Sequence, residues 1–234
     1  TQRRLANSLP GEPPRYVEPV VPVIFPESAE VPETQLHFEV QTILYQLLFD
    51  HLGPDITVGS NQFVYFNAAE PKQCLAPDVY VRLAPRGAPI RSWKVWERGA
   101  PEIAVEIVSD DDREADVWEL KLRRYRQLGV SELVRFDPEA SGTAALRIWD
   151  RVDGALLERE LTGASAPSVV LNFDWVLAPA DGFELALRIG VGEDGRTLLL
   201  TRAEARKVEA EARQAAEARV RELEAELARR SDPK

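Results

Sequence analysis

The chain has 234 residues, 44% of them apolar and 29% charged, which suffices for one globular domain with appendages or at most two small domains. It has no apolar stretch of roughly 18 residues, no basic-then-apolar amino-terminal segment and a single cysteine, Cys74, so we expect a cytoplasmic protein without membrane partner, signal peptide or internal disulfide. The net charge of −10, from 29 basic and 39 acidic residues, argues against tight non-specific binding of nucleic acid by a dense basic face, but leaves a local acidic metal site open.

The amino-terminal part of the chain is rich in proline, with seven of the 17 prolines in residues 1–33. Because proline fixes φ and removes a backbone donor, we expect this arm to be extended and irregular. Residues 20–25 either add an edge strand to the fold or lie across its core, and the sequence leaves both alternatives open. We therefore set residues 1–33 apart from a folded domain that we place at residues 34–200.

A helix is predicted over residues 34–51, because Thr34 can cap its amino end and Gly53-Pro54 can end it. Glu39 falls on the apolar stripe of this helix, although an acid at the edge of such a stripe is ordinarily solvated. The stripe recurs at helical spacing and consists of Leu36, Val40, Ile43, Leu44, Leu47 and Leu48.

Short segments rich in β-forming residues follow this helix. Residues 56–58 and 62–66, separated by the Gly-Ser-Asn sequence at 59–61, predict a hairpin. The strongest strand signal spans residues 103–108, where β-branched side chains dominate. The other predicted strands are residues 78–83, 93–96, 133–136, 145–149 and 156–161.

The strand at residues 103–108 carries one acid among apolar side chains. Since successive side chains point to opposite faces, Ile103, Val105 and Ile107 should share one face and Glu106 the other. The apolar flanks favour a central strand, where an unpaired carboxylate is costly. Glu106 is therefore predicted to need a cation or a proton as a companion.

A second helix is predicted over residues 113–128. Its apolar face includes Trp118 and Tyr125, and Lys121 lies in the middle of that face. A lysine in such a place ordinarily snorkels, with its ammonium group in solvent. Because Glu106 lies just upstream on an element that this helix should pack against, we favour the alternative that the two side chains meet.

Other polar residues give weaker signals. Asp78 follows Pro77 at the start of a strand, which alone indicates a turn. We interpret Asp110–Asp112 as a solvated loop and a cap for the second helix. His37 and Cys74 have no second His or Cys at ligand spacing, so we interpret both as structural and do not predict zinc.

The end of the chain is predicted to form a long helix. Residues 201–230 contain no Gly or Pro and are rich in Ala, Glu and Arg. Val220, Leu223 and Leu227 have the spacing of a coiled coil. Because Ala buries little area per turn, residues 201–234 are as compatible with a single helix as with a coiled coil.

Several short motifs follow one another along the chain: Phe25-Pro26-Glu27-Ser28 with Thr34 and His37, Pro77-Asp78, Glu106-x-x-Ser109, Lys121 with Tyr125, Gly129-Val130, and Phe136-Asp137-Pro138. Their order resembles that of the Uma2 family of restriction-endonuclease-like proteins, over roughly residues 23–200. That family belongs to the PD-(D/E)XK nuclease superfamily. The resemblance implies an α/β (α+β mixed) fold with a restriction-endonuclease-like core, in which helices flank a mixed β-sheet in the order αβββαβ.

The resemblance implies catalytic roles for individual residues. Asp78 would be the motif aspartate and Glu106 the acid of the second half-motif. Lys121 would be the lysine, which in this family has moved from two residues after that acid to the following helix. Glu39 would match a first-helix acid. The chain departs from the family at Asp110–Asp112, where a proline and small hydroxyl residues are more usual.

These roles imply metal-dependent cleavage of DNA. Asp78 and Glu106, with the main-chain carbonyl of Ile107, would bind one Mg²⁺ or Mn²⁺ ion, since oxygen ligands suit these cations. Lys121 would orient the attacking water or stabilise charge on the phosphate.

DNA is thus the expected substrate, and a homodimer is the expected assembly, because many nucleases of this superfamily cut two strands as pairs. Two alternatives remain open: a catalytically silent scaffold that pairs through its carboxy-terminal helix, and a hydrolase of another phosphate ester. The candidate contacts to the DNA backbone are Arg123, Arg124 and Arg126.

Overall fold

The computed structural model of the protein describes residues 34–109 and 111–231, which form two compact units that divide between Leu199 and Leu200. The proline-rich arm at residues 1–33, with its alternative edge strand, and Asp110 lie outside the described residues. The first unit contains three β-sheets and the helices that cover them. The second is a single long helix, α4 (Arg202–Ser231), which confirms the predicted carboxy-terminal helix.

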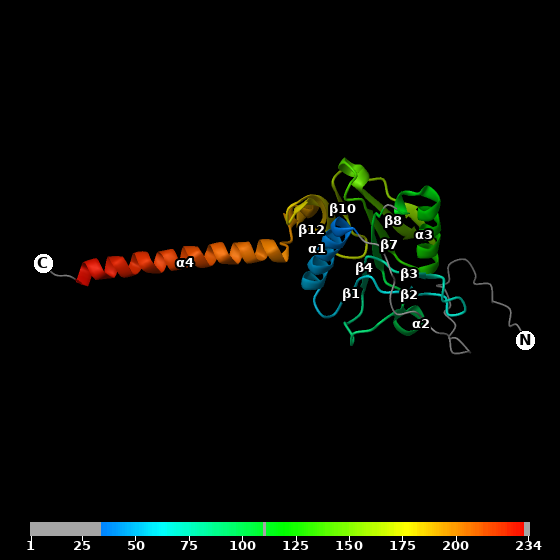
Figure 1. The fold of residues 1–234 in the computed structure, drawn as a ribbon, viewed down its shortest axis with the longest axis horizontal. Helices are drawn as coiled ribbons and strands as arrows, with labels where there is room; N and C mark the ends of the chain where they lie inside the picture. Colours follow the sequence, from blue (N-terminus) through cyan, green and yellow to red (C-terminus); the bar gives the residue numbers. More distant parts are fainter. Residues whose placement is uncertain (1–33, 110, 232–234) are drawn as a thin grey trace, which may run out of the picture. The chain divides into compact units, whose positions relative to one another are not determined.

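A six-stranded sheet with the strand order β1-β4-β6-β7-β8-β9 forms the centre of the first unit (Figure 1). β6 and β7 are parallel, and the other neighbouring strands are antiparallel. A parallel pair needs a crossover connection, which α3 (Ala115–Leu128) supplies between β6 and β7. The six strands are β1 (Thr57–Gly59), β4 (Val79–Arg82), β6 (Ile103–Ile107), β7 (Glu132–Phe136), β8 (Leu146–Val152) and β9 (Ala155–Glu158).

Helices and two smaller sheets cover the two faces of the central sheet (Figure 1). α1 (Gln35–His51) shares one apolar core with the central sheet and a four-stranded sheet, and α3 shares the other with a three-stranded sheet. This arrangement confirms the predicted α/β class with a mixed sheet flanked by helices. The four-stranded sheet consists of β10 (Ser165–Pro167), β11 (Asp174–Ala180), β12 (Phe183–Val191) and β13 (Thr197–Leu198), and the three-stranded sheet of β3 (Cys74–Leu75), β2 (Val64–Tyr65) and β5 (Trp93–Lys94).

Most predicted elements recur with shifted ends. α1 coincides with the first predicted helix, and the Thr34 hydroxyl accepts a hydrogen bond from the N–H of His37 at 3.2 Å. α3 begins two residues later than predicted, because residues 111–113 form a 3₁₀ turn. The strand predicted at residues 93–96 ends after Lys94, and the short helix α2 (Val95–Arg98) follows at once.

The predicted hairpin between residues 56–58 and 62–66 is wrong. β1 pairs with β4, whereas β2 pairs with β3 and β5 in a separate sheet. Between β1 and β2, Asn61 has a φ of 50°, and its N–H donates to the carbonyl of Pro77 at 3.1 Å. These contacts direct the chain from one sheet into the other. A turn signal specifies a local bend and does not specify which strand becomes the partner.

Glu132 joins the central sheet to the four-stranded sheet through a buried carboxylate. Its oxygens accept hydrogen bonds from the indole N–H of Trp175 at 2.6 Å, the N–H of Val169 at 2.6 Å and the hydroxyl of Ser168 at 3.0 Å. The guanidinium group of Arg159 lies 3.5 Å away. Burial nevertheless raises the pKa of Glu132 above its ordinary value, because the loss of hydration outweighs these favourable contacts.

The pH dependence of stability should reveal this carboxylate. Because the folded-state pKa is raised, the contribution of Glu132 to stability is fully present below its unfolded-state pKa and is lost as pH rises through its folded-state pKa. We expect Glu132→Gln, which cannot titrate, to escape this loss. The free energy of unfolding of the wild type relative to this variant should therefore fall from about pH 4 upward. Urea unfolding of both proteins at a series of pH values from about pH 4 upward measures this difference in free energy. A difference that does not change with pH would contradict the prediction.

The second unit, α4, begins with a capping box. The Thr201 hydroxyl accepts from the N–H of Glu204 at 3.1 Å, and the Glu204 carboxylate accepts from the N–H of Thr201 at 2.9 Å. Although α4 has 30 residues, neither it nor any other helix in the described part of the chain is apolar enough to cross a membrane. Its predicted coiled-coil positions are exposed, and they are Val220, Leu223 and Leu227.

Candidate active site

Asp78 is fixed at the start of β4, beside the end of β6. The two strands run antiparallel, with Val79 opposite Val105. The Asp78 carboxylate accepts a hydrogen bond from the N–H of Ile107 at 2.6 Å, and the residue is only 7% exposed. The sheet register therefore holds this acid next to Glu106.

α1 contributes two buried polar side chains that contact Asp78. The Nε2 atom of His37 lies 2.9 Å from Oδ1 of Asp78. The side-chain amide of Gln41 donates to the Asp78 carbonyl at 2.9 Å and to the Ser60 hydroxyl at 2.9 Å. His37 and Gln41 are four residues apart, so they share one face of the helix. His37, which the sequence presents as a structural residue, therefore contacts one of the candidate metal ligands.

Glu106 points from β6 toward α3, as the strand alternation predicts. One carboxylate oxygen accepts from the Lys121 ammonium group at 2.7 Å, and the other accepts from the Tyr125 hydroxyl. Lys121 and Tyr125 lie four residues apart on the face of α3 that also carries buried Trp118. The structure thus brings Lys121 to Glu106, which is 3% exposed, instead of directing its ammonium group into solvent.

The interpretation of Asp110–Asp112 as a solvated loop and helix cap is wrong for Asp112. Its side chain is 8% exposed, and its carboxylate accepts from Lys121 at 2.7 Å and from the Ser109 hydroxyl at 3.1 Å. The position that caps α3 is Glu114, whose side chain makes no capping bond. The 3₁₀ turn at residues 111–113 rotates Asp112 inward, which a run of three aspartates does not reveal.

These residues form an acidic cluster, which consists of Asp78, Glu106 and Asp112 and in which Lys121 contacts Glu106 and Asp112. Burial raises the pKa of Glu106 to about 7, while the Lys121 ammonium lowers it and the Asp78 carboxylate raises it. Burial lowers the pKa of Lys121, but the Glu106 and Asp112 carboxylates together raise it above its ordinary value, so Lys121 remains charged. The acidic cluster therefore combines three buried carboxylates with one ammonium group that contacts two of them, an arrangement that a further cation would stabilise.

Residues 27–191 match the model of the Uma2 family, described as "Putative restriction endonuclease". The chain belongs to the Uma2 family. It is also similar to the crystal structure of a "putative nuclease belonging to DUF820" from Anabaena variabilis ATCC 29413, with 14% sequence identity, a TM-score of 0.44 and coverage of 65% of this chain and 75% of that chain. A comparison with curated proteins gives no match.

The candidate metal ligands of this Uma2 protein are oxygen donors, the ligand type that hard divalent cations prefer. Mg²⁺ is commonly bound through one or two carboxylates, with water or substrate oxygens completing its coordination. Asp78 and Glu106, with the main-chain carbonyl of Ile107, offer ligands of this kind. In residues 34–109 and 111–231, no group of three or more His, Cys, Asp or Glu side chains is arranged to hold a metal ion. The side chains of Asp78 and Glu106 would therefore supply only part of the coordination shell of a divalent cation, and water and substrate would supply the rest.

No described contact joins Glu39 to the acidic cluster. Its carboxylate accepts from the side-chain amide of Gln35 at 2.6 Å, and the residue is half-buried. The face of α1 that meets Asp78 is occupied by His37 and Gln41. Because an α-helix has 3.6 residues per turn, Glu39, two residues from each of them, points in a different direction. Glu39 therefore does not lie on the inward-facing apolar stripe of α1, where the sequence analysis placed it.

The three arginines proposed to contact DNA lie on α3, and no described contact joins them to the acidic cluster. Arg123 and Arg126 are exposed, and Arg124 is half-buried. Burial raises the pKa of Cys74 in β3, and the charge of Arg124 is one of the influences that oppose this shift. A role for these arginines at the phosphate backbone stays a prediction.

The spacing of some residues in the sequence could have indicated a role that the sequence analysis missed. His37 and Gln41 are polar residues four apart within a helix whose other inward positions are apolar. Tyr125 lies four residues after Lys121 and shares its face of α3. Spacing of this kind can indicate side chains with a common target. Asp112 left no such signal, because its direction depends on a turn outside the regular helix.

Proposed function

We propose that this Uma2 protein is a metal-dependent endonuclease that hydrolyses phosphodiester bonds in DNA. The observation that carries the proposal is the meeting of Asp78 and Glu106, from adjacent strands, with Lys121 from the following helix. Two carboxylates can hold a hard cation beside a lysine that can face an anionic phosphate. Membership of the Uma2 family supports a nuclease.

The residues of the acidic cluster would divide the chemistry among them. A bound Mg²⁺ or Mn²⁺ ion supplies a Lewis acid that polarises the scissile phosphate and lowers the pKa of a water molecule. Lys121 has three N–H donors, of which Glu106 and Asp112 occupy two. The third can donate to a phosphate oxygen or to the attacking water. Because Lys121 remains an ammonium group, it can stabilise the negative charge that develops on the phosphate.

Other residues would hold the two metal-binding acids in their orientations. His37 and the N–H of Ile107 contact the two oxygens of Asp78. The Tyr125 hydroxyl donates to Glu106, and burial raises the pKa of Tyr125, so this hydroxyl stays protonated at neutral pH. Such neighbours restrict how each carboxylate can rotate, which favours a single geometry for the ion and its water.

Calorimetric titration with Mn²⁺ tests the metal site. We expect the wild type to bind the ion, and Asp78→Ala and Glu106→Ala to lose this binding, because each variant removes one of two carboxylate ligands. Glu119→Ala is a matched control, since Glu119 is an exposed acid on α3. A wild type that binds no Mn²⁺ would remove the basis of the nuclease proposal. Plasmid nicking with Mg²⁺ by the same proteins then tests cleavage of DNA.

A catalytically silent scaffold is the second candidate function. The observation that favours it is the exposure of apolar residues along α4, where Val220, Leu223 and Leu227 are 54%, 42% and 63% exposed. These positions could pair with a second copy of the chain. A protein that forms dimers but neither binds Mn²⁺ nor nicks plasmid would favour the scaffold over the nuclease.

A further inference from the structure

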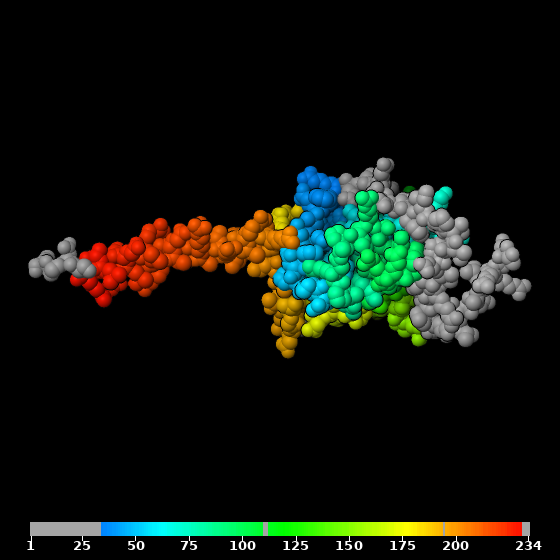
Figure 2. Space-filling model, turned by 90° about the horizontal axis from the view of Figure 1, so that it is seen from below, coloured from blue at the N-terminus to red at the C-terminus, as the bar shows by residue number. Residues whose placement is uncertain are grey.

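A cavity of about 770 Å³ lies at the edge of the central sheet formed by β1. Its walls come from α1, from β1 with the turn that follows it, and from residues 84–98. Figure 2 shows α1 in blue beside the green segment that includes these residues. Arg86 joins the two walls, because its guanidinium group donates to the carbonyl of Phe49. The cavity is within the size range of pockets that enclose a small ligand.

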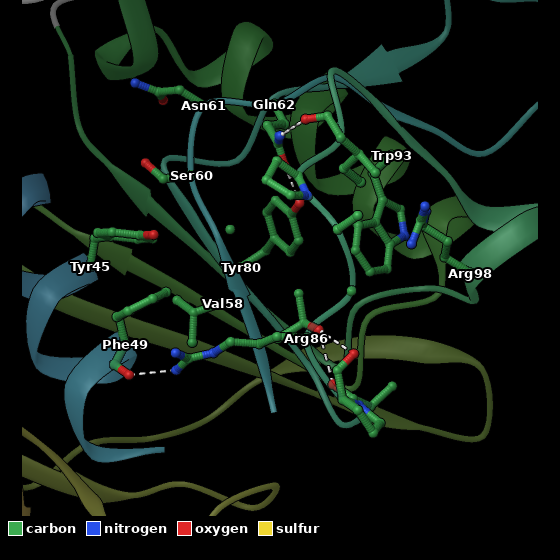
Figure 3. Close-up of a pocket in the computed structure, with 18 of the residues that line it drawn as sticks. Tyr45, Phe49, Val58, Ser60, Asn61, Gln62, Tyr80, Arg86, Trp93 and Arg98 are labelled. Atoms are coloured by element: carbon green, nitrogen blue, oxygen red, sulfur yellow. Dashed lines mark hydrogen bonds between the residues drawn. The ribbon is translucent and has the colours of Figure 1, made fainter. Parts of the chain in front are cut away.

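The α1 wall presents two aromatic rings to this cavity, and the guanidinium group of Arg86 lies against one of them (Figure 3). The rings of Tyr45 and Phe49 lie 5.5 Å apart, and the Arg86 guanidinium carbon lies 3.7 Å from the centroid of the Phe49 ring. Tyr45 and Phe49 are four residues apart, so they follow one another along the same face of α1. A flat ligand can pack against such a surface.

Across the cavity lies a second set of rings (Figure 3). Tyr80 and Trp93 meet edge to face with their centroids 5.4 Å apart, and Arg98 lies 5.7 Å from the Trp93 centroid. The Tyr80 ring lies over Gly59, where an added Cβ would come within 2.1 Å of it. The Tyr80 hydroxyl donates to Gln62 at 2.6 Å, which fixes the ring. These contacts hold the Tyr80 ring in place on this wall of the cavity.

The charge of the cavity is opposite to that of the whole protein. Arg86 donates to the backbone carbonyls of Phe49 and Ile56, and no carboxylate is among its described contacts. Glu97 is the one acid in the described lining of the cavity, and its carboxylate lies 3.3 Å from the ammonium group of Lys94. Arg98 has no carboxylate among its described contacts. In a chain with a net charge of −10, two guanidinium groups beside aromatic rings favour a ligand that is both planar and anionic.

Two residues of the cavity lining contact the backbone beside the acidic cluster. Gln41, which lines it, donates to the carbonyl of Asp78, and the N–H of Asn61 donates to the carbonyl of Pro77 at 3.1 Å. A ligand in the cavity is thus separated from Asp78 by the Gln41 and Ser60 side chains. The cavity therefore lies beside the segment that carries Asp78, one of the two proposed metal ligands.

We infer that the cavity binds one unpaired nucleotide of the substrate strand, close to the phosphate that is cleaved. The base would stack on the aromatic rings, and Arg86 and Arg98 would attract the neighbouring phosphates. A base within a duplex already has both faces stacked, so only an unpaired or flipped base can enter. The inference rests on the proposed function for the identity of the strand, and it assigns to this protein a preference for unpaired DNA.

Binding of a fluorescein-labelled single-stranded oligodeoxynucleotide, measured by fluorescence anisotropy in EDTA, tests the inference. We expect the wild type to bind this strand more tightly than the duplex of the same sequence. Tyr45→Ala and Arg98→Ala should each weaken single-strand binding by about tenfold, because one stacking or cationic contact is lost. Arg221→Ala, at an exposed position of α4, is the matched control and should bind like the wild type. Unchanged urea unfolding midpoints would show that the variants are folded.

Single-strand binding by Tyr45→Ala and Arg98→Ala that equals wild-type binding would overturn the inference. Free 5′-dAMP that binds as tightly as the strand would also overturn it, since the cavity would then belong to a free nucleotide. Because the measurement requires no turnover, the two proposals can fail separately. If Tyr45→Ala and Arg98→Ala weaken single-strand binding but the wild type does not cleave plasmid, the nuclease proposal is wrong. If the wild type cleaves plasmid but these variants bind the strand as the wild type does, only this inference is wrong.

Discussion

Lys121→Met is expected to reduce DNA cleavage by about 10²–10³-fold and to lower the free energy of unfolding at neutral pH by about 3 kcal/mol. Methionine keeps an apolar stem but removes the ammonium group that Glu106 and Asp112 each bind at 2.7 Å. Cleavage should fall because the charge that faces the phosphate is lost. Stability should fall because two buried carboxylates lose their partner. Plasmid nicking measures the first effect and urea unfolding the second.

The loss of stability in Lys121→Met should grow with pH. The Lys121 ammonium lowers the pKa of Glu106, which burial raises to about 7, so its removal should raise this pKa further. A group with a raised folded-state pKa contributes stability that is present below its unfolded-state pKa and is lost as pH rises through the folded-state value. The difference between wild type and variant should thus be smallest at about pH 5 and largest above about pH 7.

The double variant Glu106→Gln/Lys121→Met separates the two effects of Lys121. It removes the buried carboxylate together with its ammonium partner, so it should regain part of the stability that Lys121→Met loses. It should not regain cleavage, because a metal ligand and the lysine are both absent. Wild-type cleavage by Lys121→Met would show that Lys121 serves only the fold.

Alternation and helical spacing were sufficient to predict the meeting of Glu106 and Lys121. The alternation placed Glu106 on the α3 side of β6, away from Ile103 and Val105. The spacing placed Lys121 on the face of α3 that also carries Trp118. Both patterns act within one element, and the short connection between β6 and α3 brings the two elements together. The cost of a buried, unpaired carboxylate then favours contact with the lysine.

Asp78 and Asp112 show the limit of such reasoning. Asp78 reaches the end of β6 through the antiparallel pairing of β4, and strand order is a property of the whole sheet. Asp112 turns inward through a 3₁₀ turn, and its neighbours Asp110 and Asp111 have the same residue type. The wrong hairpin has the same cause, because residues 59–61 indicate a bend without naming a partner. Local propensity specifies elements, whereas tertiary contacts decide which elements meet.

The four-stranded sheet was also beyond the sequence analysis, which predicted no strands after residue 161. Its outer strands β10 and β13 are only three and two residues long, too short for a clear alternating pattern. β11 and β12 have seven and nine residues, and the apolar residues at alternate positions of β12, from Phe183 to Ile189, were a signal that the sequence analysis missed. The buried carboxylate of Glu132 helps to join this sheet to the rest of the fold. An acid at the start of a strand ordinarily faces solvent, so its burial follows only from the arrangement of the two sheets.

Asp112→Ala is expected to reduce DNA cleavage by about 10–100-fold, mainly through kcat, although Asp112 is not proposed to bind the metal ion. Its carboxylate fixes Lys121 at 2.7 Å and is itself held by the Ser109 hydroxyl at 3.1 Å. Without it, Lys121 would keep Glu106 as its partner but lose the second contact that sets the direction of its third donor. Single-turnover cleavage of a labelled DNA substrate measures this loss.

The conservative variant Asp112→Asn distinguishes positioning from general destabilisation. An asparagine oxygen can still accept from Lys121, so Asp112→Asn should cleave faster than Asp112→Ala even though it lacks the negative charge. Asp116→Ala, which removes an exposed acid in the first turn of α3, should cleave like the wild type. If Asp112→Ala instead cleaves faster than the wild type, Asp112 competes with the phosphate for Lys121. The departure of this chain from the Uma2 pattern at residues 110–112 would then inhibit cleavage. The two results exclude each other, because the Asp112 carboxylate cannot both orient Lys121 toward the phosphate and keep it from the phosphate.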